Sequence, residues 1–224
     1  MGTIVDLIGK TDEQAVTELT AAFKNLGGKD QLHVKGSGDY RAVISGFQNS
    51  HWGQFDWLPI RVETGAWSGY LAAKSSSFAS IVQIMESQHK HCDTMYVEAE
   101  NTLNGGNETE GKVLMEAFIW NMEVHFGREE QILFPAFEEK TGMTGGGPTH
   151  VMRAEHEQIR GVLKEMKESL KEGDYQRIFD QAETMLILIQ QHNSKEEQIL
   201  YPMLDQHLGE DLEQIAKEVQ LFVL

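Results

Sequence analysis

The second half of the sequence contains one helical segment twice, and this duplication constrains the fold more than any other feature. Residues 125–135 read HFGREEQILFP and residues 192–202 read HNSKEEQILYP, an offset of 67 residues. The same offset relates residues 85–89, MESQH, to residues 152–156, MRAEH. Unrelated core histidines have no reason to obey one offset. The sequence therefore predicts one helical hairpin that is present in two related copies.

Long helical patterns fill the chain after residue 75, and Gly- and Asn-rich breaks separate them. Short connections between long amphipathic helices favour antiparallel neighbours. We therefore expect residues 76–224 to form an all-α, up-down four-helix bundle with a short additional helix at its C-terminal end. The long helices are predicted over 77–103, 109–139, 149–171 and 174–206, and the short one over 209–220.

Residues 1–75 have a different character, with short β-branched and apolar segments between turn residues. A capping-box pattern at Thr11 opens a first helix, and a second helix is expected over 39–49. Pro59 cannot donate to a sheet, so the strand that contains it should lie at an edge or carry a bulge. We therefore expect a small α+β domain with the order βαβαββ. Its strands are predicted over 3–8, 31–35, 55–63 and 66–73.

Each copy of the repeat can present metal-ligating side chains to one point. In the first copy His125 precedes Glu129 by four residues, and the second copy repeats this spacing. Residues i and i+4 lie on one helix face, about 6 Å apart along the axis. Each copy adds a histidine from its preceding helix, 36 residues earlier. The predicted cluster in the bundle interior comprises His89, His125, Glu129, His156, His192 and Glu196.

Such a cluster is costly to bury unless it binds cations. Buried carboxylates and imidazoles cost several kcal/mol unless they are paired or coordinate a metal. Two metal ions, bridged by the two carboxylates and with the imidazoles as terminal ligands, would satisfy all six groups. The mixed nitrogen and oxygen ligand set suits iron or manganese best, with zinc as an alternative.

Two other metal motifs do not fit the sequence. A ferritin-like di-iron bundle needs Glu-x-x-His on two helices, and the chain shows it once, from Glu86 to His89. A zincin needs His-Glu-x-x-His. His156 is followed by a glutamate, but Arg160 occupies the position of the second histidine.

The paired HxxxEExxL[FY]P segments, with a histidine in the first and third helices, resemble the hemerythrin-like (HHE cation-binding) family over about residues 77–207. The resemblance implies two iron ions with oxo or hydroxo and carboxylate bridges, held by the six residues named above. Oxygen-carrying hemerythrins have a further histidine where this chain has Arg160, so one iron is expected to keep an open position. This departure favours the four-histidine members, which include bacterial iron-centre repair and nitric-oxide-responsive proteins.

Residues 1–75 are similar, more weakly, to the small βαβαββ domains of the sulfur-carrier type that occur fused to such bundles. Sulfur carriers use a cysteine, and residues 1–75 contain none. We therefore interpret this part of the chain as an interaction or regulatory module.

The expected function is a non-haem di-iron protein that binds or senses oxygen or nitric oxide. The alternative is a di-iron enzyme, or an iron-delivery protein for nitrosative or oxidative stress and iron–sulfur repair. The expected partners are the diatomic ligand and a second copy of the chain in a homodimer.

Composition sets further limits on the partners and on the location. The net charge of −16 argues against nucleic-acid binding, because such a surface repels phosphates. No apolar run approaches the roughly 20 residues of a membrane span. A single cysteine and the lack of a signal-peptide pattern favour the bacterial cytoplasm.

Residues next to the predicted ligands have simpler interpretations. Glu130 and Glu197 follow the two predicted bridging glutamates and point about 100° away from them, so we expect them to be solvated. Tyr201 and Phe134 occupy equivalent positions in the repeat, and we expect both to pack in the core.

Three further side chains leave alternatives open. His91 competes with His89 as a ligand, and the duplication favours His89, because the position equivalent to His91 holds a glutamine. Asp93 and Arg160 are equivalent in the repeat. They could form a surface charge pair or orient the ligands, and Asp93 could be an additional ligand.

Overall fold

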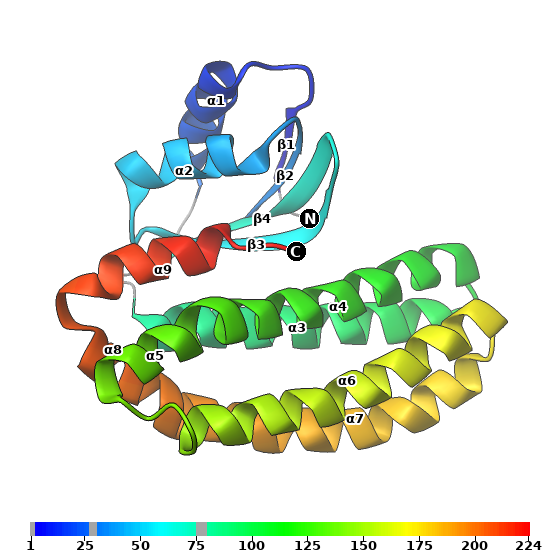
Figure 1. Cartoon of the computed structure of the whole chain (residues 1–224). Helices are drawn as coiled ribbons and strands as arrows, with labels where there is room; N and C mark the ends of the chain where they lie inside the picture. Colours follow the sequence, from blue (N-terminus) through cyan, green and yellow to red (C-terminus); the bar gives the residue numbers. More distant parts are fainter. Residues whose placement is uncertain (1–2, 27–30, 75–79) are drawn as a thin grey trace.

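The computed structural model describes residues 3–26, 31–74 and 80–224. A sheet with two helices forms the N-terminal part, and long helices form the rest (Figure 1). The N-terminal elements have the predicted order βαβαββ. They are β1 (Thr3–Leu7), α1 (Asp12–Lys24), β2 (Gln31–Ser37), α2 (Tyr40–His51), β3 (Phe55–Glu63) and β4 (Ala66–Ala73).

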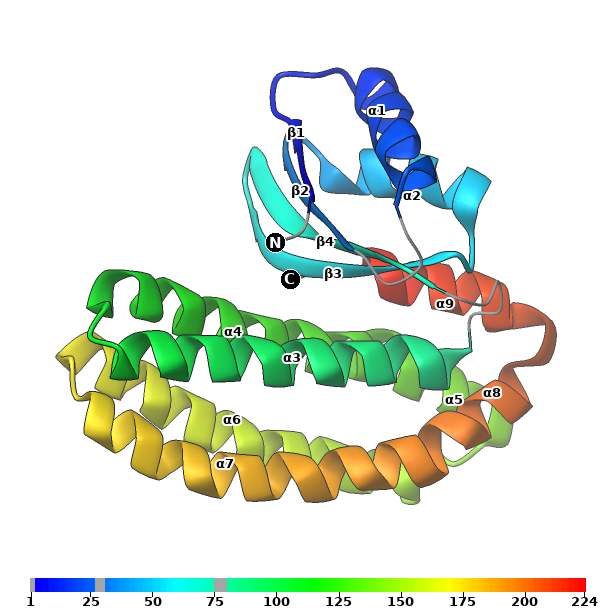
Figure 2. The ribbon, with the colours of Figure 1, turned by 180° about the vertical axis from the view of Figure 1, so that it is seen from behind.

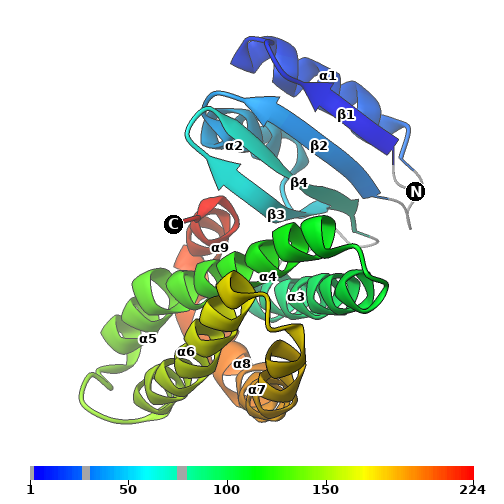
Figure 3. The same ribbon diagram turned by 90° about the vertical axis from the view of Figure 1, so that its right-hand side faces the viewer.

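The sheet has the strand order β1-β2-β4-β3, with β1 and β2 parallel and the other pairs antiparallel. The predicted capping box is present, because Thr11 and Gln14 bond to each other's backbone N–H groups. The position of Pro59 is also as predicted. It lies in the edge strand β3, where the pairing register shifts between Pro59 and Arg61. This edge lies nearest to the long helices α3 and α4 (Figure 3).

The C-terminal region is helical. Two of its long helices, α3 and α4, lie side by side, as do α6 and α7 (Figure 2). The predicted start of the first long helix at residue 77, and the predicted domain boundary after residue 75, lie outside the described residues. The α-helices are α3 (Ile81–Asn104), α4 (Glu108–Arg128), α5 (Phe134–Thr141), α6 (Pro148–Glu172), α7 (Tyr175–Lys195), α8 (Tyr201–Leu208) and α9 (Leu212–Leu221).

The helices predicted over 109–139 and 174–206 are not continuous α-helices. A π-helical turn interrupts each of them, η1 (Glu129–Leu133) and η2 (Glu196–Leu200). The prolines Pro135 and Pro202 explain the position, because proline lacks an N–H group and its ring clashes with the carbonyl four residues before it. A π-helical turn relieves this conflict, and such turns are frequent at functional sites.

The C-terminal end of the chain packs against the N-terminal sheet domain. Val223 and, from α4, Val124 are buried in the same apolar cluster as the residues of the sheet. The Tyr40 hydroxyl on α2 donates a hydrogen bond to the Leu221 carbonyl at the end of α9. The sheet domain is therefore fixed to the helical region through both α4 and the C-terminal residues. Among the described residues, no helix is long and apolar enough to cross a membrane.

Gly127 and Gly161 offer a test of this packing. A Cβ on Gly127 would lie 2.6 Å from the Phe222 ring, whereas one on Gly161 meets no described atom within 4 Å. Overpacking costs about 1–3 kcal/mol, and alanine stabilises an open helix position by about 0.5–1 kcal/mol relative to glycine. Gly127→Ala should therefore lower the free energy of unfolding in urea, and Gly161→Ala should raise it. Equal effects of the two substitutions would contradict the packing of Phe222 on α4.

Candidate metal centre

The six residues predicted as metal ligands come together in the interior of the helical region. Each of the six is at most 5% exposed. The two glutamates each begin a π-helical turn, and the histidines lie on the four long helices. They are His89 on α3, His125 on α4, Glu129 on η1, His156 on α6, His192 on α7 and Glu196 on η2.

The cluster has two ends, and each could hold a metal ion. The His89 end consists of His89, His125 and Glu196, whose ligand atoms lie within 4.8 Å of one another. Its two imidazole Nε2 atoms are 3.2 Å apart. The Nε2 atom of His89 lies 3.4 Å from Glu196 Oε2, and that of His125 lies 3.4 Å from Glu129 Oε2.

The His156 end consists of His156, His192, Glu129 and Glu196, and it meets the same distance limit. Its two Nε2 atoms are 3.1 Å apart. The Nε2 atom of His156 lies 3.1 Å from Glu129 Oε2, and that of His192 lies 3.1 Å from Glu196 Oε1. Both glutamates therefore contact both ends of the cluster.

Two of the histidines direct their outer nitrogen, Nδ1, toward a carboxylate. The Nδ1 atom of His89 lies 2.7 Å from Glu197 Oε1, and that of His156 lies 2.7 Å from Glu130 Oε1. The prediction that Glu130 and Glu197 are solvated therefore holds only in part, because their side chains are 23% and 33% exposed but each bonds a histidine. In each EEQIL segment the first glutamate enters the cluster, and the second contacts a histidine of the other copy. The repetition of both glutamates at the same offset was the available signal.

The remaining two histidines follow the same repeat. His192 Nδ1 lies 3.1 Å from Glu155 Oε2, and His125 Nδ1 lies 3.4 Å from Gln88 Oε1. Gln88 and Glu155 are themselves 67 residues apart. Acceptors at Nδ1 favour the tautomer in which Nδ1–H donates and the Nε2 lone pair points into the cluster. Four lone pairs and two carboxylates therefore converge on the interior.

Unsatisfied carboxylate oxygens indicate what the cluster lacks. Glu129 Oε2 and Glu196 Oε1 are buried and have no hydrogen-bond partner among the described residues. A buried acceptor without a partner costs free energy. Two cations between the imidazoles would satisfy both oxygens and all four lone pairs, so the residues fit a pair of metal ions.

Without a bound cation, protons can satisfy some of the buried carboxylate oxygens and imidazole lone pairs. Burial alone would lower the pKa of His89, but hydrogen bonds with Glu196 and Glu197 raise that pKa to about 9. Burial and the Glu196 charge raise the pKa of Glu129 well above its usual value. Burial would also raise the pKa of Glu196, but the adjacent imidazoles of His192 and His89 hold it well below the usual value. Cation binding should therefore release protons.

The comparisons with known proteins agree with this geometry. The sequence profile of the hemerythrin HHE cation binding domain matches residues 80–204, more than half of the chain. The chain belongs to the hemerythrin HHE cation-binding family. An uncharacterised hemerythrin-like protein of Schizosaccharomyces pombe is 28% identical over 94 residues, which cover 42% of this chain and 45% of that protein. The chain thus spans less than half the length of this relative. No solved structure matches the chain.

In this hemerythrin-family chain, Arg160 lies beside the candidate metal centre and bonds two nearby glutamates. Arg160 donates from Nη1 and Nη2 to the two oxygens of Glu130, at 2.8 and 3.0 Å, and from Nε to Glu123 at 3.0 Å. Because Glu130 bonds His156, this arrangement corresponds to the alternative in which Arg160 orients a predicted ligand. Asp93 is exposed and is not among its partners.

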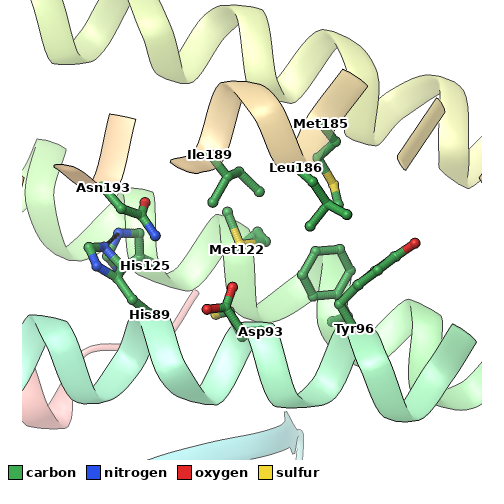
Figure 4. Close-up of a pocket in the computed structure, with 11 residues that line it drawn as sticks. His89, Asp93, Tyr96, Met122, His125, Met185, Leu186, Ile189 and Asn193 are labelled. Atoms are coloured by element: carbon green, nitrogen blue, oxygen red, sulfur yellow. Dashed lines mark hydrogen bonds between the residues drawn. The ribbon is translucent and has the colours of Figure 1, made fainter. Parts of the chain in front are cut away.

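Asp93 instead lines a small cavity beside the His89 end. The cavity lies between α3, α4 and α7, and its volume of about 10 Å³ is enough for about one water molecule. Figure 4 shows His89 and His125 at one end of it, with Asp93 and Asn193 nearby. Only a very small molecule fits this space.

Tyr201 is a residue of the centre that the sequence interpretation missed. Its hydroxyl oxygen lies 2.8 Å from Glu129 Oε1 and 2.9 Å from Glu196 Oε2, so the O–H group donates to these carboxylates. Its equivalent, Phe134, packs in the core as predicted, with its ring 5.7 Å from that of His156. The only signal in the sequence was the exchange of Phe for Tyr between two otherwise similar segments.

The contact between Glu130 and His156 can be tested by its effect on metal affinity. Glu130→Ala should weaken metal binding about 10–100-fold, because the loss of such an outer partner releases the ligand imidazole. Glu157→Ala is a matched control, because Glu157 also bonds Arg160 but is exposed and lies on the outside of α6. Competition titrations with a chromogenic chelator measure the metal affinity of both variants. Similar losses in the two variants would show that Glu130 does not act through His156.

Proposed function

We propose that residues 76–224 form a hemerythrin-type up-down bundle that holds two iron ions and binds or senses oxygen or nitric oxide. One observation carries this proposal. Four imidazole Nε2 atoms and two carboxylates converge in a buried interior, and two of the carboxylate oxygens have no partner among the described residues. The family supports a cation site of this kind, typically for iron.

Each end of the cluster would hold one ion. His89 and His125 would be the terminal ligands at one end, and a second histidine pair would serve the other. Glu129 and Glu196 would bridge the ions. Support for bridging comes from Glu196, whose Oε2 lies 3.4 Å from His89 and whose Oε1 lies 3.1 Å from His192. The nitrogen and oxygen ligand set favours iron over softer metals, and manganese and zinc are the alternatives.

The bound iron would supply the position at which a diatomic molecule is held, and the chain supplies its surroundings. Buried ligands exclude bulk water from the centre. The cavity of about 10 Å³ beside His89 and His125 restricts access to very small molecules. We interpret residues 1–75 as an interaction or regulatory module, since the sheet domain packs on α4 at Val124, the residue that precedes His125.

Two buried histidines on α3, His89 and His91, allow a test of which buried histidines bind metal. His91 is buried like His89, but its Nε2 atom lies 3.2 Å from the Pro59 carbonyl oxygen, to which its N–H donates. His89→Gln should remove one metal ion per chain or reduce its affinity by more than tenfold, because a ligand is lost. His91→Gln should retain the wild-type metal content, measured by elemental analysis. A loss of metal in His91→Gln alone would reverse the assignment.

The proposed function is tested on protein purified without oxygen. We expect about two irons per chain, with new absorption bands after exposure to oxygen or nitric oxide. Two zinc ions, or a folded protein without metal, would contradict the proposal. Rapid loss of iron to a chelator under native conditions would instead indicate iron delivery, since buried ligands should retain the metal.

A further inference from the structure

Among the positions at which the two copies of the repeat differ, one brings a side chain into the interior of the candidate metal centre. Tyr201 follows Glu196 by five residues, and Phe134 follows Glu129 by five residues. Both side chains are fully buried. The second copy therefore brings a polar atom to the interior where the first copy brings only carbon.

The Tyr201 oxygen lies within the group of ligand atoms at the His89 end. It is 3.4 Å from His89 Nε2 and 2.9 Å from Glu196 Oε2. The two atoms His89 Nε2 and Glu196 Oε2 are themselves 3.4 Å apart. Donor atoms bound to one ion at about 2.1 Å, at right angles, are separated by about 3 Å. The phenol oxygen is therefore placed like a ligand.

The Tyr201 oxygen is also 2.8 Å from Glu129 Oε1, so it contacts both predicted bridging groups and one terminal histidine. At the His156 end the equivalent Phe134 ring packs against His156 and offers no donor atom. The asymmetry is thus confined to one end of the cluster.

We propose that Tyr201 is a phenolate ligand of the metal ion at the His89 end, which makes the two ions of the centre inequivalent. This inference rests on the proposed function, because it needs a metal at that end. The phenol loses its proton to solvent, and the oxygen forms one bond to the ion through its lone pair. No oxidant or reductant is required for this step. The charge of the ion offsets the burial of a negative oxygen.

The experiment uses the full-length chain loaded with ferric iron. A phenolate bound to iron(III) gives a visible charge-transfer band and tyrosinate ring modes in resonance Raman spectra. We expect both signals in the wild type and a loss of at least tenfold in Tyr201→Phe, with two irons retained. Tyr96→Phe is the matched control, because Tyr96 is also buried in the helical region but bonds Glu100. It should keep the full signal.

Phenylalanine should be tolerated at position 201, since the first copy of the repeat already packs a phenylalanine, Phe134, at the equivalent position. Zinc loading gives a second readout that does not depend on iron. The wild type should release about one more proton per chain than Tyr201→Phe, because a metal-bound phenol is deprotonated. A two-iron wild type without the band, or equal proton release from both proteins, would overturn the inference. A wild type that binds zinc but no iron would contradict the proposed function. The difference in proton release between the wild type and Tyr201→Phe would then still show whether Tyr201 binds the metal.

Discussion

The structure of this chain depends on the burial of two carboxylates and four imidazoles in one helical interior. Such groups cost several kcal/mol when they are removed from water without compensation. Hydrogen bonds from the Nδ1 atoms of the histidines offset part of this cost, and the hydrogen bond from the Tyr201 hydroxyl to Glu129 offsets a further part. The remaining lone pairs point at one another and at carboxylate oxygens. A pair of cations is the simplest group that satisfies them, and the membership of the hemerythrin HHE family agrees with that chemistry.

The surroundings of the cluster link it to the rest of the molecule. Arg128 immediately precedes Glu129 and is only 2% exposed. Its Nε–H donates to the Phe222 carbonyl at 3.3 Å, and burial lowers its pKa to about 10. The C-terminal residues that contact the sheet domain therefore also contact the residue beside a predicted bridging ligand. This is a physical route by which the sheet domain and the cluster could influence each other.

Much of the local structure follows from pattern. The strand over Ala66–Ala73 and the edge position of Pro59 were predictable, because side-chain alternation and the missing proline N–H act locally. The six residues of the cluster could be named because the repeat marks them. The π-helical turns were not predicted, since a proline inside a helical pattern allows a kink, an end or a wider turn. Packing around Phe134 and Tyr201 chooses among these.

The duplicated pattern alone was enough to indicate two related hairpins and the side chains that enter their shared interior. It could not assign Glu130 and Glu197, because each bonds a histidine from the other copy, and periodicity on one helix carries no information about a partner helix. It also could not distinguish Tyr201 from a core residue, since a hydroxyl becomes functional only when folding places it beside other polar atoms. These contacts depend on distances between segments far apart in the chain, which only the assembled tertiary structure sets.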